Sequence, residues 1–318
     1  MINILVSTDN HLGFKEKNPE RCNDSFLALE EVLDIPKKKE VDMILLLGDL
    51  FDESNTSLST INRCIEIMDK RIGRKKPIGN TLYLDKPNDF LLDKFCIPTV
   101  LIHGNHDLPF NEQKNGSLDI LAKAGFVKYI GKQPSYDNIK LSPFVIEKEG
   151  LRIGLYPLGF IKDAKLNYLL RMKKLSFEEG ENLHFRLLLV HQNRDRAAKP
   201  GASPKNCLCL ELLPCDFFHM ILWGHEHESI PNLEESEARG LSIYQPGSTI
   251  PTSIKRSEGL PKHAGILKFS KKGIKLDPVF LTYQRNIIIE EINFDRSMFA
   301  GAKNVEEALV QRIVQKHS

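Results

Sequence analysis

The apolar residues of this chain fall into short runs that stop abruptly at polar residues. Five runs end just before a residue able to bind a metal ion; they cover residues 2–6, 41–47, 97–102, 186–190 and 220–223. Nearly continuous apolar runs of this length are typical of strands buried on both faces. In open α/β sheets, functional sites form beyond the carboxyl ends of the strands. The pattern therefore predicts that one sheet edge collects polar side chains from across the chain.

Helical periodicity separates the runs in the first part of the chain. The candidate helices cover residues 26–33, 58–68 and 118–124, with Ser57 or Ser59 as a possible N-cap of the second. Strand–helix–strand alternation over 1–110 predicts βαβ units with largely parallel pairing. Apolar runs at 144–146 and 151–156 predict a second sheet.

Two segments break this rhythm. Residues 73–95 contain two Pro and two Gly and are expected to form an insertion between a helix and its next strand. The sequence changes character again near residue 286, where 287–289 predict a strand and 305–314 an amphipathic helix. We therefore expect a main domain over 1–285 and a short appendage over 286–318.

Composition narrows the class of protein. The chain has 318 residues, of which 41% are hydrophobic, and no apolar run is long enough for a membrane span. Because the first run begins at residue 2, we expect no secretory leader, and the six cysteines show no paired framework. A net charge of +2 does not by itself predict nucleic-acid binding, and each local cluster of Lys and Arg is by itself typical of a solvated surface.

The residues that follow the five runs form an ordered series: D-x-H, GD, GNHD, H and GHEH. Each piece is weak evidence alone, but a coincidental series of all five is improbable. The candidate metal ligands are Asp9, His11, Asp49, Asn105, His191, His225 and His227. Imidazole together with carboxylate and amide oxygens suits Mn, Fe or Zn better than Mg.

Seven ligands are enough for two ions. One ion would take Asp9, His11, Asp49 and His227, and the other would take Asp49, Asn105, His191 and His225, so Asp49 would bridge them. Two ions about 3.5–4 Å apart can hold the attacking and leaving oxygens of a phosphoryl displacement. His106 lies outside this ligand set and is the candidate general acid.

The series DxH, GD, GNHD, H and GHxH resembles that of the calcineurin-like metallophosphoesterases. This resemblance implies an α/β fold, a four-layer αββα sandwich of two mixed sheets flanked by helices. Calcineurin-type protein phosphatases read GDxVDRG and GNHE, whereas this chain reads GDLFDE from Gly48 and GNHD from Gly104. The absence of the Arg-Gly pair disfavours that branch.

The text around the motifs is similar to the Mre-eleven family of double-strand-break-repair nucleases. The similar stretches are 7–17, 41–54, 102–107, 118–127, 190–194, 221–228 and 244–253. The resemblance implies manganese-dependent endonuclease and 3′-to-5′ exonuclease activity on DNA, with two Mn²⁺ ions, although Mg²⁺, Fe²⁺ or Zn²⁺ also fit such ligands. It also implies a nuclear location. Arg194, Lys255 and Arg256 are the basic residues that we expect to contact DNA.

The resemblance also implies partners. They are a Rad-fifty-type ATPase, an Nbs-one-type regulatory subunit that would bind through 73–95, and a second copy of the chain that would pack on helices at 57–72 and 115–125. Leu58, Ile61, Ile65 and Met68 could supply the apolar dimer face or could equally pack on their own sheet. In the family, a DNA-capping domain follows the nuclease domain, so residues 286–318 are expected to begin that domain.

One residue departs from the family pattern. Eukaryotic and archaeal members usually carry a His at the position of Asp52, where it assists the phosphate during exonuclease turnover. A carboxylate cannot supply the same hydrogen bond, so we expect Asp52 to alter the exonuclease activity. Two other functions stay open: a phosphoesterase that acts on phosphoproteins, nucleotides or other non-DNA substrates, and a DNA-end-binding scaffold with weak nuclease activity.

Overall fold

The computed structural model describes residues 1–72, 83–84, 97–108, 115–194, 206–236, 240–289 and four helical residues, 306–307 and 309–310. The insertion expected at 73–95 lies outside the described residues, apart from the backbone of a two-residue strand, β3 (Tyr83–Leu84). The chain divides into two compact units, 1–287 and 288–318. The strand expected at 287–289 is wrong, because these residues have no strand structure.

The first sheet has six strands in the order β15-β14-β1-β2-β4-β5. Its members are β1 (Ile2–Ser7), β2 (Met43–Leu47), β4 (Thr99–Ile102), β5 (Lys128–Tyr129), β14 (His263–Ser270) and β15 (Gly273–Phe280). Strands β1, β2, β4 and β5 are parallel, as the βαβ pattern predicts. β14 runs antiparallel to β1 and pairs Ile2 with Phe269 and Val6 with Gly265. Every residue of β1, β2 and β4 is buried, which explains their unbroken apolar sequence.

The second sheet has seven strands in the order β12-β13-β11-β10-β8-β7-β3. Its further members are β7 (Phe144–Lys148), β8 (Leu151–Leu158), β10 (Phe185–His191), β11 (Met220–Gly224), β12 (Glu234–Glu235) and β13 (Ser242–Tyr244). The predicted strands at 144–146 and 151–156 are thus confirmed as β7 and β8. A separate pair, β6 (Ile139–Leu141) and β9 (Leu175–Phe177), lies beside this sheet.

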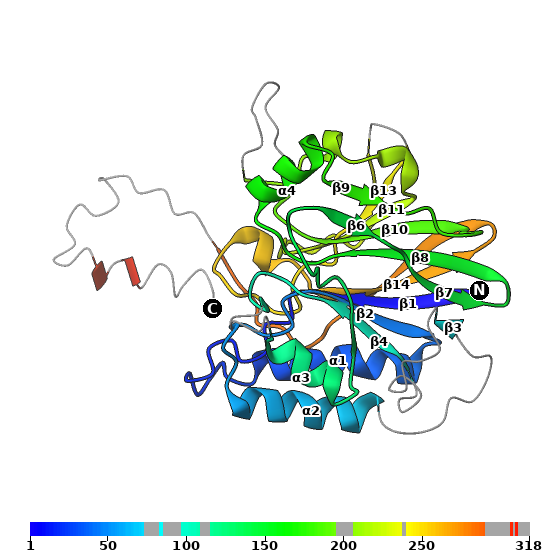
Figure 1. Ribbon diagram of the computed structural model, residues 1–318. Coiled ribbons are helices and arrows are strands. Elements are labelled where there is room, and N and C mark those ends of the chain that lie inside the picture. The colour runs from blue at the N-terminus through cyan, green and yellow to red at the C-terminus, as the bar shows by residue number, and fades with distance from the viewer. Residues whose placement is uncertain are drawn as a thin grey trace. The chain divides into compact units, whose positions relative to one another are not determined.

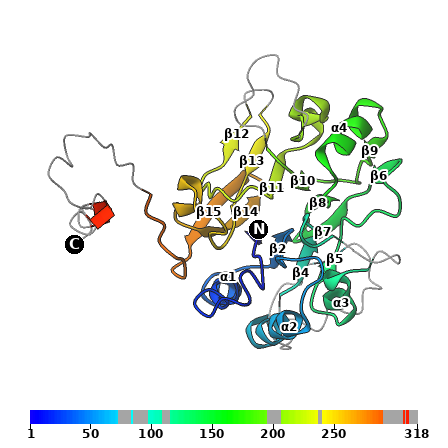
Figure 2. The same cartoon turned by 90° about the vertical axis from the view of Figure 1, so that its left-hand side faces the viewer.

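Helices cover the outer face of each sheet (Figures 1 and 2). The first sheet carries α1 (Asp24–Lys38), α2 (Leu58–Ile72) and α3 (Ser117–Lys123), and the second carries α4 (Asp163–Arg171). The first three helices match the predicted ones. Ser57 caps α2, because its Oγ accepts a hydrogen bond from Thr60 N at 3.1 Å.

Three apolar cores separate four layers. Leu29 of α1 and Met68 of α2 pack with Leu5 of β1 on one face of the first sheet. A second core joins the facing sides of the two sheets, and a third lies between the second sheet, α4 and the turns η2 (Leu210–Leu212) and η3 (Cys215–Phe217). This arrangement confirms the predicted αββα sandwich. Within the described residues, no helix is long and apolar enough to span a membrane.

The polar strand ends come from both sheets rather than from one. Asp9, Asp49 and Asn105 follow β1, β2 and β4 of the first sheet, whereas His191 ends β10 and His225 follows β11 of the second. The expectation of a single sheet edge is therefore wrong. Two packed sheets present their carboxyl ends on the same side, and residues 187–191 of β10 pair in parallel with 220–224 of β11.

The apolar face of α2 is divided between the core and the surface. Ile61 and Met68 are buried in the core between the helices and the first sheet, and Ile65 packs against it. Leu58 is 83% exposed and Ile120 of α3 is 47% exposed. Ile61 and Met68 are therefore not available as an apolar dimer face, and Leu58 and Ile120 are the exposed apolar residues of these two helices.

Candidate metal centre

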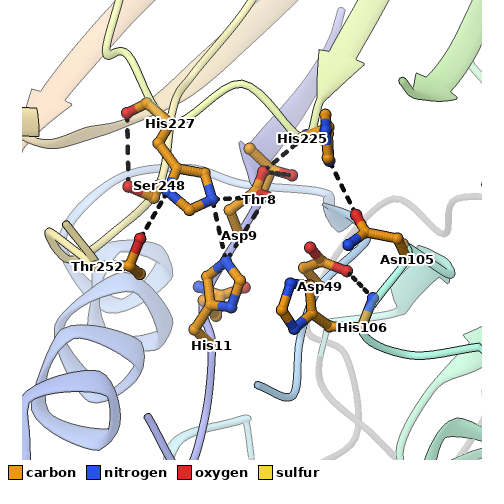
Figure 3. Close-up of polar contacts among 12 residues, drawn as sticks. Thr8, Asp9, His11, Asp49, Asn105, His106, His225, His227, Ser248 and Thr252 are labelled. Carbon is orange, nitrogen blue, oxygen red and sulfur yellow. Dashed lines mark hydrogen bonds and ion pairs between the residues drawn. The ribbon is translucent and has the colours of Figure 1, made fainter. Parts of the chain in front are cut away.

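The side chains that follow the strand ends converge on one site (Figure 3). Asp9, His11, Asp49 and His191 are buried, while Asn105, His106, His225 and His227 are partly exposed. Three groups of side chains each bring their ligand atoms within 4.8 Å of one another: Asp9 with His11 and His227, Asp49 with His191 and His225, and His11 with Asp52 and His106. The first two groups contain six of the seven predicted ligands.

The backbone is strained at several of these residues. Asp9, His11, Asp49 and His225 have φ angles of 50°, 48°, 49° and 83°. Residues other than glycine rarely adopt this left-handed region, and each one costs about 1–3 kcal/mol, which contacts in the surrounding structure must offset. This conformation turns the backbone sharply after each strand, so that a side chain just past the strand end faces the site.

Two glycines of the motifs leave room for the ligands. A Cβ atom at Gly104 would lie 2.1 Å from Asp49 Oδ1, and one at Gly48 would lie 2.4 Å from His191 Nδ1. Gly48 also has a φ of 95°. The glycines of GD and GNHD are therefore required by close packing around Asp49.

Asp9 has a buried carboxylate oxygen that fits a cation. Its Oδ1 accepts no hydrogen bond from the described residues, and it lies 3.6 Å from Nε2 of His227 and 3.9 Å from Nε2 of His11 and of His191. The other oxygen, Oδ2, lies 2.6 Å from Thr8 Oγ1 and accepts a hydrogen bond from His225 N at 3.0 Å. Burial by itself would raise the pKa of Asp9, but the surrounding imidazoles outweigh it and hold this pKa well below its usual range.

Asp49 belongs to the second group of ligands. Its Oδ2 is 3.2 Å from His191 Nε2, and its Oδ1 accepts a hydrogen bond from His106 N at 2.8 Å. Burial opposes ionisation of this carboxyl, yet its pKa is lowered, chiefly by His191. A buried, ionised carboxylate at this position is suited to bind cations.

Two histidines are oriented through their Nδ1 atoms. His191 Nδ1 donates to the Leu47 carbonyl oxygen at 2.7 Å, and His227 Nδ1 lies 2.9 Å from Thr252 Oγ1. Their Nε2 atoms therefore face the site. Although burial lowers both values, Asp49 and Asp9 raise the pKa of His191 to about 9, and Asp9 and Glu258 raise the pKa of His227 to about 10.

His225 differs from these two. Its Nδ1 lies 2.8 Å from Asn105 Oδ1, and its Nε2 lies 3.0 Å from Asn193 Oδ1. Burial and the nearby His191 lower its pKa to about 4, so the ring is neutral at physiological pH. A neutral imidazole is the form that binds metals.

His106 lies beside the ligands rather than among the first two groups. Its Nδ1 donates to the backbone carbonyl of Asp52, and its ring centroid lies 5.0 Å from that of His11. The Nε2 atom is therefore the one available to a substrate. The next residue, Asp107, accepts hydrogen bonds from Leu50 N and Phe51 N at 2.9 Å, which joins the GD and GNHD loops.

Asp52 contacts a predicted ligand. Its Oδ1 lies 3.1 Å from Nδ1 of His11, and its side chain is 21% exposed. The carboxylate therefore lies behind the imidazole and reaches the rim of the site. The resemblance to the nuclease family had implied only that the residue at this position lies next to the phosphate of the substrate.

The three basic residues expected to contact DNA differ in their surroundings. Arg194 pairs with Glu234, bonds to Gln245 Oε1 at 3.1 Å and lies over the Trp223 ring, with a side chain that is only 10% exposed. The structure therefore disfavours a DNA contact for Arg194, because its guanidinium is held internally. Lys255 and Arg256 are exposed, at the start of the turn η4 (Arg256–Gly259).

Sequence reasoning missed several residues that hold the ligands. They are Thr8, Asn193, Thr252 and Glu258. Thr8 and Asn193 are one or two positions from a predicted ligand, and that proximity is the only signal that could have found them. Thr252 and Glu258 follow no apolar run.

The part of the chain that matches a known family contains all seven candidate ligands and His106. Residues 2–229 match the family model of the calcineurin-like phosphoesterases. The chain belongs to the calcineurin-like phosphoesterase family. Within this phosphoesterase family the chain is similar to double-strand break repair proteins named MRE11, which confirms the resemblance seen in the sequence. It is 36% identical over 304 residues to the one from Homo sapiens, with 91% of this chain and 42% of the relative covered.

Two further relatives cover more of this phosphoesterase. The MRE11 of Arabidopsis thaliana is 33% identical, with 100% of this chain and 47% of the relative covered. That of Encephalitozoon cuniculi is 34% identical, with 98% and 52% covered. The chain thus spans about half the length of these curated relatives.

Proposed function

We propose that this phosphoesterase is a manganese-dependent DNA nuclease that hydrolyses phosphodiester bonds with two metal ions. The observation that carries the proposal is the pair of ligand groups, Asp9 with His11 and His227, and Asp49 with His191 and His225. The similarity to MRE11 proteins over at least 91% of the chain supports DNA as the substrate. Both endonuclease and 3′-to-5′ exonuclease activity are part of the proposal.

Each ion would take ligands from both sheets. The first would bind Asp9, His11, Asp49 and His227; the second would bind Asp49, Asn105, His191 and His225. Bound divalent ions would lower the pKa of a shared water and offset charge on the phosphate. The donor set of imidazoles, carboxylates and one amide suits Mn²⁺, and Fe²⁺, Zn²⁺ and Mg²⁺ are the competing ions.

His106 acts as the general acid in this proposal. The hydrogen bond from Nδ1 to the Asp52 carbonyl fixes the ring and leaves Nε2 to donate to the phosphate or to the leaving oxygen. Asp52 supports His11 and places a carboxylate at the rim where relatives usually carry His. We therefore propose that the exonuclease activity of this chain is altered relative to those members.

DNA reaches the site across a basic turn. Lys255 and Arg256 are exposed and follow Thr252 and Ser253, which contact His227 or its supporting Glu258. Phosphate contacts from such cations position a duplex without reading its sequence.

Further proposals concern the assembly. A second copy of the chain would pack on α2 and α3, where Leu58 and Ile120 are exposed. A Rad-fifty-type ATPase, an Nbs-one-type regulatory subunit bound through 73–95, and a nuclear location rest on the similarity to MRE11 proteins. So does the proposal that 286–318 begins a DNA-capping domain.

Substrate competition tests the proposed function against the alternatives. We would compare kcat/KM, with Mn²⁺, for labelled single- and double-stranded DNA, bis(p-nitrophenyl) phosphate and p-nitrophenyl phosphate. A DNA nuclease prefers both DNA substrates and cleaves the diester faster than the monoester. Preference for the monoester would favour a non-DNA phosphoesterase, and DNA binding without turnover of any substrate would favour a scaffold. An Asp49→Ala variant is the control for contaminating nucleases.

A further inference from the structure

A buried carboxylate stands behind the ligand His227. Glu258, in the turn η4, is only 4% exposed, and its Oε1 lies 3.3 Å from His227 Nδ1. Thr252 Oγ1 is close to both, 2.9 Å from His227 Nδ1 and 3.3 Å from Glu258 Oε1. The same carboxylate accepts hydrogen bonds from Thr252 N and Ser253 Oγ, each at 2.7 Å.

The direction of the hydrogen bonds among Glu258, Thr252 and His227 decides which nitrogen of His227 carries the proton. An ionised carboxylate can only accept, so the Thr252 hydroxyl donates to Glu258 and accepts from His227 Nδ1. In the neutral ring the proton is then held on Nδ1, and the lone pair of Nε2 faces Asp9 Oδ1 at 3.6 Å and His11 Nε2 at 3.2 Å. Only a nitrogen with a free lone pair can bind a metal ion.

The backbone of His227 is fixed from the same side. Lys262, which is fully buried, donates from Nζ to the His227 carbonyl at 2.9 Å and lies 3.0 Å from Ser248 Oγ. Glu258 and Lys262 thus place one anion and one cation around a single ligand. Buried charges are costly unless they are paired or hydrogen-bonded. Both groups meet this condition through their contacts with His227 and its neighbours.

We propose that Glu258 is a positioning residue that holds His227 in the tautomer and orientation required for metal binding; the inference rests on the proposed metal centre. Carboxylates that orient a metal-binding imidazole typically change metal affinity about 10–100-fold when they are replaced. Glu258 touches neither substrate nor metal and acts through His227.

The Glu258→Gln substitution tests this role. Glutamine has nearly the same shape and can still accept a hydrogen bond from Thr252 N. Its amide can also donate to Thr252 Oγ1, so the hydroxyl can donate to His227 Nδ1 and favour the tautomer with the proton on Nε2. By isothermal titration with Mn²⁺ and by electron paramagnetic resonance of the bound ions, we expect affinity for one ion to fall about 10-fold or more and affinity for the other to remain. Thr252→Val should weaken the same ion while sparing the contacts of Glu258 with Thr252 N and Ser253.

The matched control is Asp42→Asn. Asp42 is a partly buried carboxylate that accepts from Asn3 N at 2.7 Å and pairs with Lys148 at 2.6 Å, just before β2 and so at the opposite end of that strand from Asp49. This variant should bind both ions like the wild type. If Glu258 acts through His227, adding Glu258→Gln to His227→Ala should weaken metal binding no further.

The outcomes separate the inference from the proposed function. Wild type that binds no ions would contradict the metal centre itself. Wild type that binds two ions, with Glu258→Gln and Thr252→Val binding them equally well, would overturn only the role of Glu258. Additive losses in the double variant would also overturn it. If Glu258→Gln does not fold, as judged by circular dichroism without metal, Thr252→Val alone decides.

Discussion

The Nε2 atoms of His11 and His227 lie 3.2 Å apart, although the residues are 216 positions apart in the sequence. His11 belongs to the loop after β1 of the first sheet, and His227 follows β11 of the second. Two imidazoles at this distance repel each other if both are protonated, and Asp9 Oδ1 offers them a common anion. A divalent cation bound by all three groups would join the two sheets.

Metal binding should therefore stabilise the fold. With Mn²⁺ at about 100 times its dissociation constant, each site adds about 2.7 kcal/mol to the free energy of unfolding. For two sites in a protein of this size, we expect the melting temperature to rise by roughly 8 °C relative to the protein in EDTA. Differential scanning calorimetry measures the shift, and Asp9→Asn should reduce it. An unchanged melting temperature for wild type would contradict the prediction.

Metal binding should also release protons. The pKa values of about 9 for His191 and about 10 for His227 mean that both rings are protonated at neutral pH without metal. Because an ion binds only the neutral ring, the affinity for Mn²⁺ should rise about 10-fold per pH unit at each site until pH exceeds these values. Titration calorimetry in buffers of different ionisation enthalpy counts the protons, and no release at pH 7 would contradict the assignment.

Without metal, the stability of the fold should fall as pH rises, whereas the affinity for metal should increase. Groups whose pKa is raised by folding stabilise the fold below their unfolded value of 6.5, and this contribution is lost as pH rises toward 9–10. The metal-free protein should therefore lose stability between pH 6.5 and 10. Urea unfolding in EDTA measures this slope, and His227→Ala should flatten it.

Asp52→His should increase 3′ exonuclease activity on duplex ends. The carboxylate at the rim of the site repels a phosphate, whereas an imidazole can donate to it. We expect a gain of about 10-fold, which is below the roughly 10²–10⁴-fold of an optimally placed acid or base. Asp52→Asn separates removal of the anion from supply of the imidazole. If neither variant exceeds the wild type, Asp52 does not set the exonuclease rate.

Replacing both Lys255 and Arg256 by Ala should weaken DNA binding similarly for all sequences. Loss of two phosphate contacts should reduce the slope of log K against log salt by about 2. Hydrolysis of bis(p-nitrophenyl) phosphate should not change. The matched control replaces Lys271 and Lys272, which are exposed beyond Ser270, at the end of β14 that pairs with the start of β1. An equal effect of the control pair would contradict a specific DNA contact.

The sequence was enough to propose the candidate ligands, because each one lies at or shortly after the end of a buried strand. Asp49 after β2 is the simplest example, since the apolar run and the polar residue are adjacent. Glu258 could not be found in this way, because it lies in a short turn and approaches His227 only through tertiary packing. Arg194 shows the opposite problem: a cation beside a ligand suggests a surface, but Glu234 holds it inside.

The four layers were predictable through the resemblance to a known family, while the faces of single helices were not. The periodicity of α2 shows which residues are apolar but not what covers them. Met68 is packed against the first sheet and Leu58 is exposed, although both fit the same pattern. The division of candidate ligands between two sheets also needed the structure, because an apolar run does not show which other strands it pairs with.

DNA cleavage as a function of Mn²⁺ concentration tests the central claim most directly. We would follow single-turnover cleavage of labelled single- and double-stranded DNA by wild type, His106→Ala and Asp49→Ala, with the bound metal measured for each. Wild type should cleave only with metal, His106→Ala should keep its metal and lose about 10²–10⁴-fold in rate, and Asp49→Ala should lose both metal and activity. Cleavage that is absent in wild type at full metal occupancy, or that is unchanged in both variants, would contradict the nuclease assignment.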